Sequence, residues 1–196
     1  MPGPQPYKHK DLDEGHIRIL HLHPGERHYP IFVSISREKL SSIRNTYEAL
    51  SWEWGTEIGS QHIRILDEGS HETCTLPVRQ NLLDALRQFR TTDSVIRLWA
   101  DAVCIDQKNG EEKKDQIGMM TEIYRSATQA RVWLGNAHSD SAEALKYVDE
   151  LVKLDHVEHI AGLARNDLDE STAKKVNSLI NLLKRGWFSR RWVVQV

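Results

Sequence analysis

The chain has 196 residues and a formal net charge of −2, so it is long enough for one domain with a sizeable core and has no global charge that would attract nucleic acid. Two cysteines are too few for a disulfide framework, and the polar start does not resemble a signal peptide. No apolar run approaches the roughly 18 residues that a membrane-spanning helix needs. We therefore expect a cytoplasmic protein that binds neither nucleic acid nor membrane.

Two β-hairpins are expected in the N-terminal part of the chain. Residues 16–22 alternate between polar and apolar side chains, and residues 31–35 form a second apolar run after the turn signal Pro24-Gly25. Residues 63–66 and 73–76 repeat this arrangement around a polar turn that contains a glycine. Each pair of runs therefore predicts two antiparallel strands.

Three short apolar runs predict the central strands of a sheet, at residues 47–51, 97–105 and 130–134. Apolar residues at helical spacing separate and follow these runs. The expected helices begin at Asn81 as a cap, near residue 111, near Asp140 and before Val176. Strands that alternate with helices favour an α/β fold in which a parallel sheet is flanked by helices.

The chain is predicted to form a single domain over residues 1–196. Its α/β core comprises residues 47–55 and 81–196. The hairpins, within residues 1–46 and 56–80, are expected to be additions to this core.

Polar and aromatic side chains follow two of the predicted strands. Ligands of open α/β sheets bind at the carboxyl ends of the strands, so these side chains are the candidate site. The candidate binding residues are Ser51, Trp52, Trp54, Gly55, Cys104 and Gln107, and the candidate catalytic residues are Asp101 and Asp106.

The two aspartates have different expected roles. Alternation along a strand at 97–105 places Asp101 and Asp106 on opposite faces of the sheet, with Cys104 on the face of Asp106. Asp106, at the end of the strand, is better placed for a cleft. Asp101 is open to two interpretations: a catalytic carboxylate, or a structural one that satisfies backbone donors or an arginine inside the fold.

The other candidates also have structural alternatives. Alternation puts the Trp52 and Trp54 indoles on one side, where they could stack on an adenine or nicotinamide ring or fill the core. Cys104 could be a nucleophile if a cation favoured its thiolate, but a small buried side chain is the better interpretation because no partner histidine is recognisable. Ser51 and Gly55 suit a loop that a phosphate or ribose approaches.

Ten histidines call for a metal check. His21 and His23 alternate onto one face of a strand, and His156 and His159 lie three residues apart. Neither group has the four-ligand spacing of a structural zinc site, so we expect no metal.

Six segments in order along the chain carry a family resemblance. They are YEALSWEWG at 47–55, NLLDAL at 81–86, LWADAVCIDQ at 98–107, QIGMMTEIY at 116–124, VWLG at 132–135 and WFSRRWVVQ at 187–195. Together these segments resemble the fungal heterokaryon-incompatibility (HET) domain. No single segment is specific, but the combination is.

The resemblance implies a fungal cell-death effector domain in non-self recognition, joined to other regions of a longer protein. Such a domain would act with incompatibility proteins or with copies of itself. The family is thought to be distantly related to Toll/interleukin-1-receptor (TIR) domains, which implies a flavodoxin-like sheet. Some TIR domains cleave NAD, so NAD is the candidate substrate and no further cofactor is required. A binding module that triggers death without chemistry is the alternative.

The end of the chain departs from the family pattern. The pattern continues Trp-x-x-Gln-Glu, and in TIR domains a glutamate lies four residues after a tryptophan; here Trp192 is followed at that distance by Val196. A carboxylate can stabilise the oxocarbenium character that develops when an N-glycosidic bond breaks, and valine cannot. We expect this chain to be a weak or inactive NAD glycohydrolase.

Overall fold

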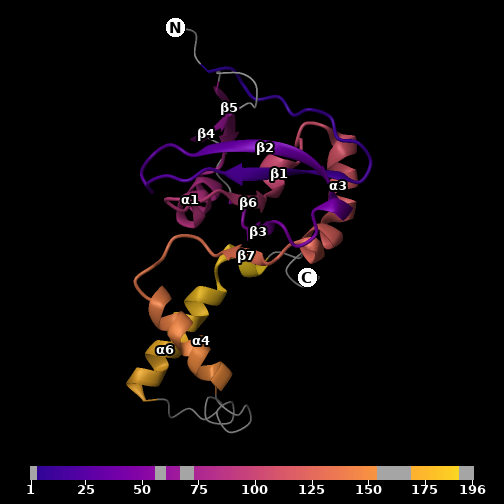
Figure 1. Cartoon of the computed structure of the whole chain (residues 1–196). Helices are drawn as coiled ribbons and strands as arrows, with labels where there is room; N and C mark the ends of the chain where they lie inside the picture. The colour runs from indigo at the N-terminus through magenta and orange to yellow at the C-terminus, as the bar shows by residue number, and fades with distance from the viewer. Residues whose placement is uncertain (1–3, 56–60, 67–72, 154–168, 190–196) are drawn as a thin grey trace. The chain divides into compact units, whose positions relative to one another are not determined.

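The computed structural model describes residues 4–55, 61–66, 73–153 and 169–189. Figure 1 shows the course of the chain. The chain divides into two compact units, of which the first ends at Trp133 and the second begins at Leu134. Residues Trp192 and Val196, which carry the prediction about the chain end, lie outside the described residues.

The first unit contains one sheet of seven described strands. They are β1 (His16–Leu22), β2 (Phe32–Lys39), β3 (Glu48–Trp52), β4 (Gln61–Leu66), β5 (Thr73–Val78), β6 (Ile96–Trp99) and β7 (Ala130–Trp133). Their order across the sheet is β5-β4-β2-β1-β6-β3-β7. The two predicted hairpins are confirmed, since β1 pairs antiparallel with β2 and β4 pairs antiparallel with β5.

The prediction of a parallel sheet holds only in part. β3 is parallel to both β6 and β7, as predicted for the three central strands, but β1 pairs antiparallel with β6, so the sheet is mixed. Ile17, Ile19, Leu20 and Leu22 of β1 are all 0% exposed. Because these side chains occupy both faces of the strand, β1 can only lie in the middle of a covered sheet. Both hairpins are therefore strands of the same sheet as the predicted core.

The described part of the first unit contains the α-helices α1 (Gln80–Phe89), α2 (Asp101–Cys104) and α3 (Gly110–Ser126). A short 3₁₀ helix at Leu40–Ser42 follows β2. α3 lies against the sheet, because the Tyr47 hydroxyl donates to the Ile123 carbonyl at 2.6 Å and the Tyr124 hydroxyl donates to the Leu50 carbonyl at 2.9 Å. α1 packs on β4.

The predicted strand at 97–105 is wrong beyond Trp99. The chain turns into α2, where the Cys104 N–H donates to the Ala100 carbonyl at 2.8 Å and the Asp101 carboxylate accepts the Ala102 N–H at 2.8 Å. An aspartate that accepts a nearby backbone N–H favours the start of a helix over a strand. The alternation of faces inferred for residues 101–106 is therefore also wrong.

The prediction that Asn81 caps α1 is wrong. The helix begins at Gln80, and Arg79 holds the N-cap position without a side-chain cap. The Asn81 side chain instead joins two other segments: its Nδ2 donates to the Glu53 carbonyl at 2.6 Å, and its Oδ1 accepts the Trp133 indole N–H at 2.7 Å.

The described residues of the second unit form two helices, α4 (Ser141–Lys153) and α6 (Glu170–Leu183), and a 3₁₀ turn at Gly186–Ser189. Ala144, Tyr147 and Leu182 are buried in it. Lys175 Nζ lies 2.7 Å from Glu150 Oε2, an ion pair that joins the two helices. No helix among the described residues is long and apolar enough to cross a membrane.

Candidate functional site

The carboxyl ends of β3 and β6 meet at one edge of the sheet. The two strands are parallel, with Ala49 opposite Trp99. The segments 51–55, which includes the end of β3, and 100–107, which follows β6, therefore lie at the same edge. This is the position where α/β sheets hold ligands, and it contains most of the predicted site residues.

Asp101 joins two tryptophans at this edge. The Trp52 indole N–H donates to Asp101 Oδ1 and the Trp54 indole N–H donates to Asp101 Oδ2, both at 2.9 Å. The two rings stack with their centroids 5.9 Å apart and their planes inclined by 17°, on one side of the chain as predicted. Trp52 is fully buried, whereas Trp54 is partly exposed. Trp54 is thus the ring that a ligand can reach.

The Asp101 carboxylate is committed to these contacts. Counting the Ala102 N–H, it accepts three hydrogen bonds from N–H groups. A carboxylate held in this way is fixed in orientation. Of the two interpretations that the sequence left open, this geometry favours a positioning role over direct chemistry.

Arg79 lies over the exposed tryptophan and was not among the predicted site residues. Its guanidinium carbon is 5.4 Å from the centre of the Trp54 ring, the geometry of a cation–π contact. The same side chain donates to the carbonyls of Trp54, at 3.4 Å, and of Gly55. Gly55 has φ +66, in the left-handed region that favours glycine. The only sequence signal of Arg79 is that it lies two residues before Asn81, the predicted start of the helix.

Gln107 also reaches Asp101, from the other end of the α2 turn. Its Nε2 donates to the Asp101 carbonyl at 2.9 Å, while its Oε1 is buried without a hydrogen-bond partner among the described residues. Ser51 lies on β3 opposite Val132 of β7. Trp54 and Gln107 therefore both contact Asp101, one through its carboxylate and one through its backbone.

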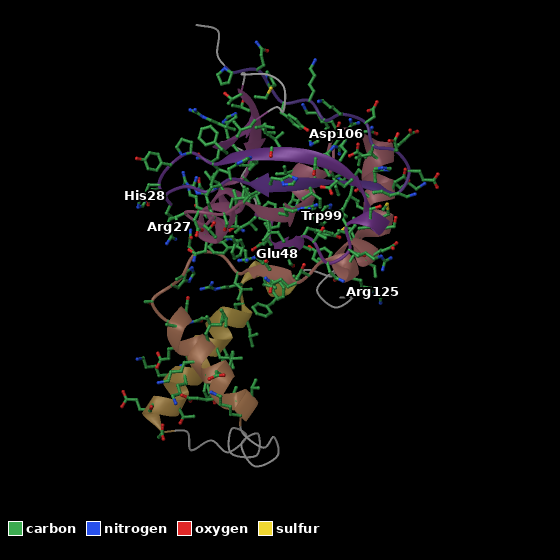
Figure 2. All side chains as sticks on the ribbon, viewed as in Figure 1. Arg27, His28, Glu48, Trp99, Asp106 and Arg125 are labelled. Atoms are coloured by element: carbon green, nitrogen blue, oxygen red, sulfur yellow. The ribbon has the colours of Figure 1, made fainter. Side chains whose placement is uncertain are left out.

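Asp106 has a different set of neighbours. Its Oδ1 accepts the Lys108 N–H at 3.0 Å and lies 3.9 Å from His9 Nδ1, and its own N–H donates to Glu112 Oε1 at 2.7 Å. These contacts join it to α3 and to the N-terminal segment; Figure 2 labels Asp106 and Trp99. Asp106 thus has contacts separate from those of the paired tryptophans.

A buried ion pair that the sequence analysis missed supports this second group. Arg18 is 1% exposed, and its two terminal nitrogens lie 2.6 and 2.9 Å from the Glu112 carboxylate oxygens. Burial alone would raise the pKa of Glu112, but the hydrogen bonds from Arg18 and from the Asp106 N–H outweigh it and hold this pKa below its usual value. Arg18 also donates to the Cys104 carbonyl at 2.9 Å.

Cys104 lies in the interior of the first unit. It is 0% exposed, and burial raises the pKa of its thiol to about 12. The thiol is therefore protonated at neutral pH, whereas the nucleophilic form of a cysteine is the thiolate. This geometry favours the interpretation of Cys104 as a small buried side chain.

Comparisons with known proteins agree with one another. The model of the family described as "Heterokaryon incompatibility protein (HET)" matches residues 47–195. The curated protein "Heterokaryon incompatibility protein 6, OR allele" of Neurospora crassa is 27% identical over 212 residues, which cover 92% of this chain and 31% of that protein. The chain thus spans about a third of the length of this relative. No solved structure matches the present chain.

Proposed function

Because the chain belongs to the heterokaryon incompatibility (HET) family, we propose that it is a cell-death effector domain of fungal non-self recognition. The family model covers most of the chain, and the Neurospora relative bears the name of the same process. The chain corresponds to only 31% of that relative. We therefore propose that the domain acts within a longer protein.

For the mechanism, we propose that the edge around Trp54 binds NAD or a related nucleotide. The observation that carries this proposal is the arrangement of Trp54, Arg79 and Asp101: a partly exposed indole with a guanidinium over its ring and a carboxylate fixing its N–H. The guanidinium would pair with a phosphate, and an adenine or nicotinamide ring would contact the exposed part of the indole. Gly55 would let the ligand approach the backbone.

The proposed chemistry is TIR-like cleavage of the nicotinamide–ribose bond. The parallel strands β6, β3 and β7 are the part of the fold that a TIR-like site would use. Asp101 would hold Trp54 in place, and Asp106 is the second carboxylate at the end of the same chain segment. Neither replaces the glutamate that the family pattern has where this chain has Val196. We therefore expect binding with little cleavage.

The experiment measures binding and cleavage separately. Titration calorimetry with NAD should show binding that Trp54→Ala weakens about tenfold or more, the value of a lost base-stacking contact. Tyr29→Ala, which removes a 63% exposed ring elsewhere, is the matched control. Nicotinamide release should be low in the natural sequence and should rise in Val196→Glu. Equal NAD affinity of the Trp54 and Tyr29 variants would refute the proposed site.

A second candidate function is death signalling by self-association, which one observation favours. The helices of the second unit expose several large apolar side chains: Leu145 at 55%, Val152 at 71%, Ile180 at 41% and Leu183 at 49%. Exposed apolar groups on paired helices are typical of protein contacts. Light scattering would show an oligomer that Leu145→Glu dissociates; a monomer at all concentrations would exclude this function.

A further inference from the structure

A cavity of about 520 Å³ is lined by residues of α1, β4, β5, the N-terminal segment and the segment before β2. Four of its lining residues carry basic side chains, namely His28, His62, Arg64 and Arg87. No lining residue is an aspartate or glutamate. The whole chain, in contrast, has a net charge of −2. A cavity with basic groups and no acidic ones attracts anions.

The sheet fixes the position of one of these arginines. Arg64 of β4 lies between Phe32 of β2 and Thr75 of β5 in the strand register. Its guanidinium carbon is 5.5 Å from the centre of the Phe32 ring, which orients the cation without neutralising it. His62, two residues earlier on the same strand, projects to the same side of the sheet.

The second arginine comes from α1. Leu83 and Arg87 lie four residues apart and therefore on one face of this helix, and Leu83 is buried. The nearest oxygen of Asp84 is 3.9 Å from Arg87 Nη1, too far for a hydrogen bond. Arg87 Nε has no hydrogen-bond partner among the described residues. The Arg87 charge is thus only partly offset, by an ion pair with Asp84 at 3.9 Å.

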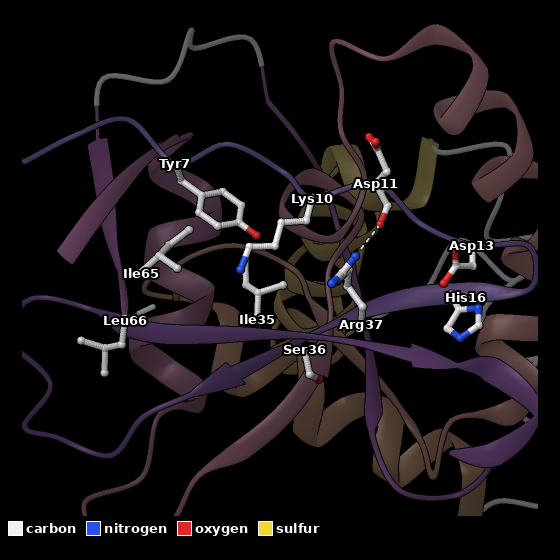
Figure 3. A pocket seen from close by; sticks show the side chains of 10 residues that line it. All are labelled: Tyr7, Lys10, Asp11, Asp13, His16, Ile35, Ser36, Arg37, Ile65 and Leu66. Atoms are coloured by element: carbon white, nitrogen blue, oxygen red, sulfur yellow. Dashed lines mark hydrogen bonds between the residues drawn. The ribbon is translucent and has the colours of Figure 1, made fainter. Parts of the chain in front are cut away.

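A comparison within the molecule shows that this charge pattern is specific. Another cavity, of about 440 Å³, lies under the N-terminal segment and is shown in Figure 3. Its lining includes Asp11 and Asp13 beside Lys10 and Arg37, so that acidic and basic groups offset each other. Arg37 there donates to the Asp11 carbonyl at 2.9 Å. Such a mixed lining does not select for the charge of a ligand.

From these observations we propose that the cavity of Arg64 and Arg87 binds the phosphate groups of a small phosphorylated molecule, of the class of a nucleoside diphosphate. Guanidinium groups form paired hydrogen bonds with phosphate oxygens, and the Thr75 hydroxyl can donate another. Ile31 and Leu83 supply an apolar wall for the rest of the ligand. A volume of about 520 Å³ suits a molecule of this size.

This site is separate from the one around Trp54 and does not depend on the proposed function. The two sites share only helix α1: Arg79, just before its first turn, contacts Trp54, and Arg87, near its end, lines the cavity. The cavity would therefore bind a phosphorylated ligand even in a chain that cleaves no NAD.

The test uses calorimetric titration of the whole chain with pyrophosphate, ADP and adenosine. In the Trp54→Ala variant, which removes the site proposed for NAD, we expect saturable one-site binding of pyrophosphate and ADP and no binding of adenosine. Arg64→Gln and Arg87→Gln should each weaken binding about tenfold or more, the value of one charge-assisted hydrogen bond. Arg44→Gln changes an arginine that is 57% exposed and paired with Glu122, and it should leave affinity unchanged.

Three results would overturn the proposal. The first is an absence of pyrophosphate binding, and the second is equal affinity in the Arg64, Arg87 and Arg44 variants. The third is binding that grows with the length of a single-stranded RNA while pyrophosphate binds only weakly, which would indicate a general polyanion surface. A thermal melt of each variant confirms folding, and Arg64 is exposed enough that its substitution should leave the core intact.

Discussion

Replacing Asp101 with asparagine should destabilise the first unit through the paired tryptophans. The single amide oxygen of asparagine can still accept from Trp52 and from the Ala102 N–H, which both bond to Oδ1 of the aspartate. Its NH₂ group would then face the Trp54 indole N–H, so that two donors oppose each other. One charge-assisted hydrogen bond is lost, which corresponds to ~2 kcal/mol.

Asp101→Ala should cost more because it also leaves the buried Trp52 N–H without a partner. An unsatisfied buried donor costs about 1–3 kcal/mol. Together with the lost Trp54 bond, the expected destabilisation is about 3–5 kcal/mol. Urea unfolding followed by tryptophan fluorescence measures both variants.

Trp54→Phe separates the hydrogen bond from the ring. It keeps an aromatic side chain and removes the N–H, so the double variant Asp101→Asn with Trp54→Phe should lose less than the sum of the single variants. Asp115→Asn, an exposed aspartate on α3, is the control and should unfold like the natural sequence. Strictly additive losses, or an unchanged urea midpoint in Asp101→Asn, would show that the Asp101–indole bonds do not stabilise the fold.

Three further predictions concern buried groups of the first unit. Arg18→Met should lower the free energy of unfolding by about 3–5 kcal/mol because it leaves the Glu112 carboxylate unpaired. Adding Glu112→Leu should restore most of this loss. A double variant as unstable as Arg18→Met would contradict the pairing. Because the pKa of Glu112 is lowered in the fold, its contribution is present above its ordinary value of 4.5 and is lost as pH falls through the lower folded pKa. Acid unfolding of Glu112→Gln should therefore be shallower than that of the natural sequence, and parallel curves would argue against this role. In native protein at pH 8, iodoacetamide should label Cys74 and spare Cys104, whose pKa is about 12. Mass spectrometry of the peptides measures the labelling, and equal labelling of the two cysteines would contradict the prediction.

The spacing of polar and apolar residues correctly predicted the hairpins and, apart from α2, the order of strands and helices. The hairpins follow from alternation with period two, and the parallel arrangement of β3, β6 and β7 follows from strands separated by helices. The strand predicted through Asp101 failed because periodicity treats an aspartate only as a polar position. Its ability to accept the next backbone N–H and start a helical turn is a property of that side chain alone.

The contacts that organise the candidate site come from distant parts of the sequence. Glu112 lies 94 residues from Arg18, and nothing in the local sequence names it as the partner. The need for some partner was visible, since Arg18 stands among Ile17, Ile19 and Leu20 in a strand that has to be covered on both sides. The pairing of Asp101 with two indoles could likewise not be predicted while residues 100–105 were assigned to a strand.

The central position of β1 has a consequence for where this domain begins. The family match starts at residue 47, yet β1 and β2 precede it and lie between the β4–β5 hairpin and β6. A fragment of residues 47–195 would therefore contain two disconnected pieces of sheet, each with a newly open edge. The stretch that identifies the family is shorter than the stretch that folds, and residues 16–39 are as necessary to the protein as the motifs by which it is recognised.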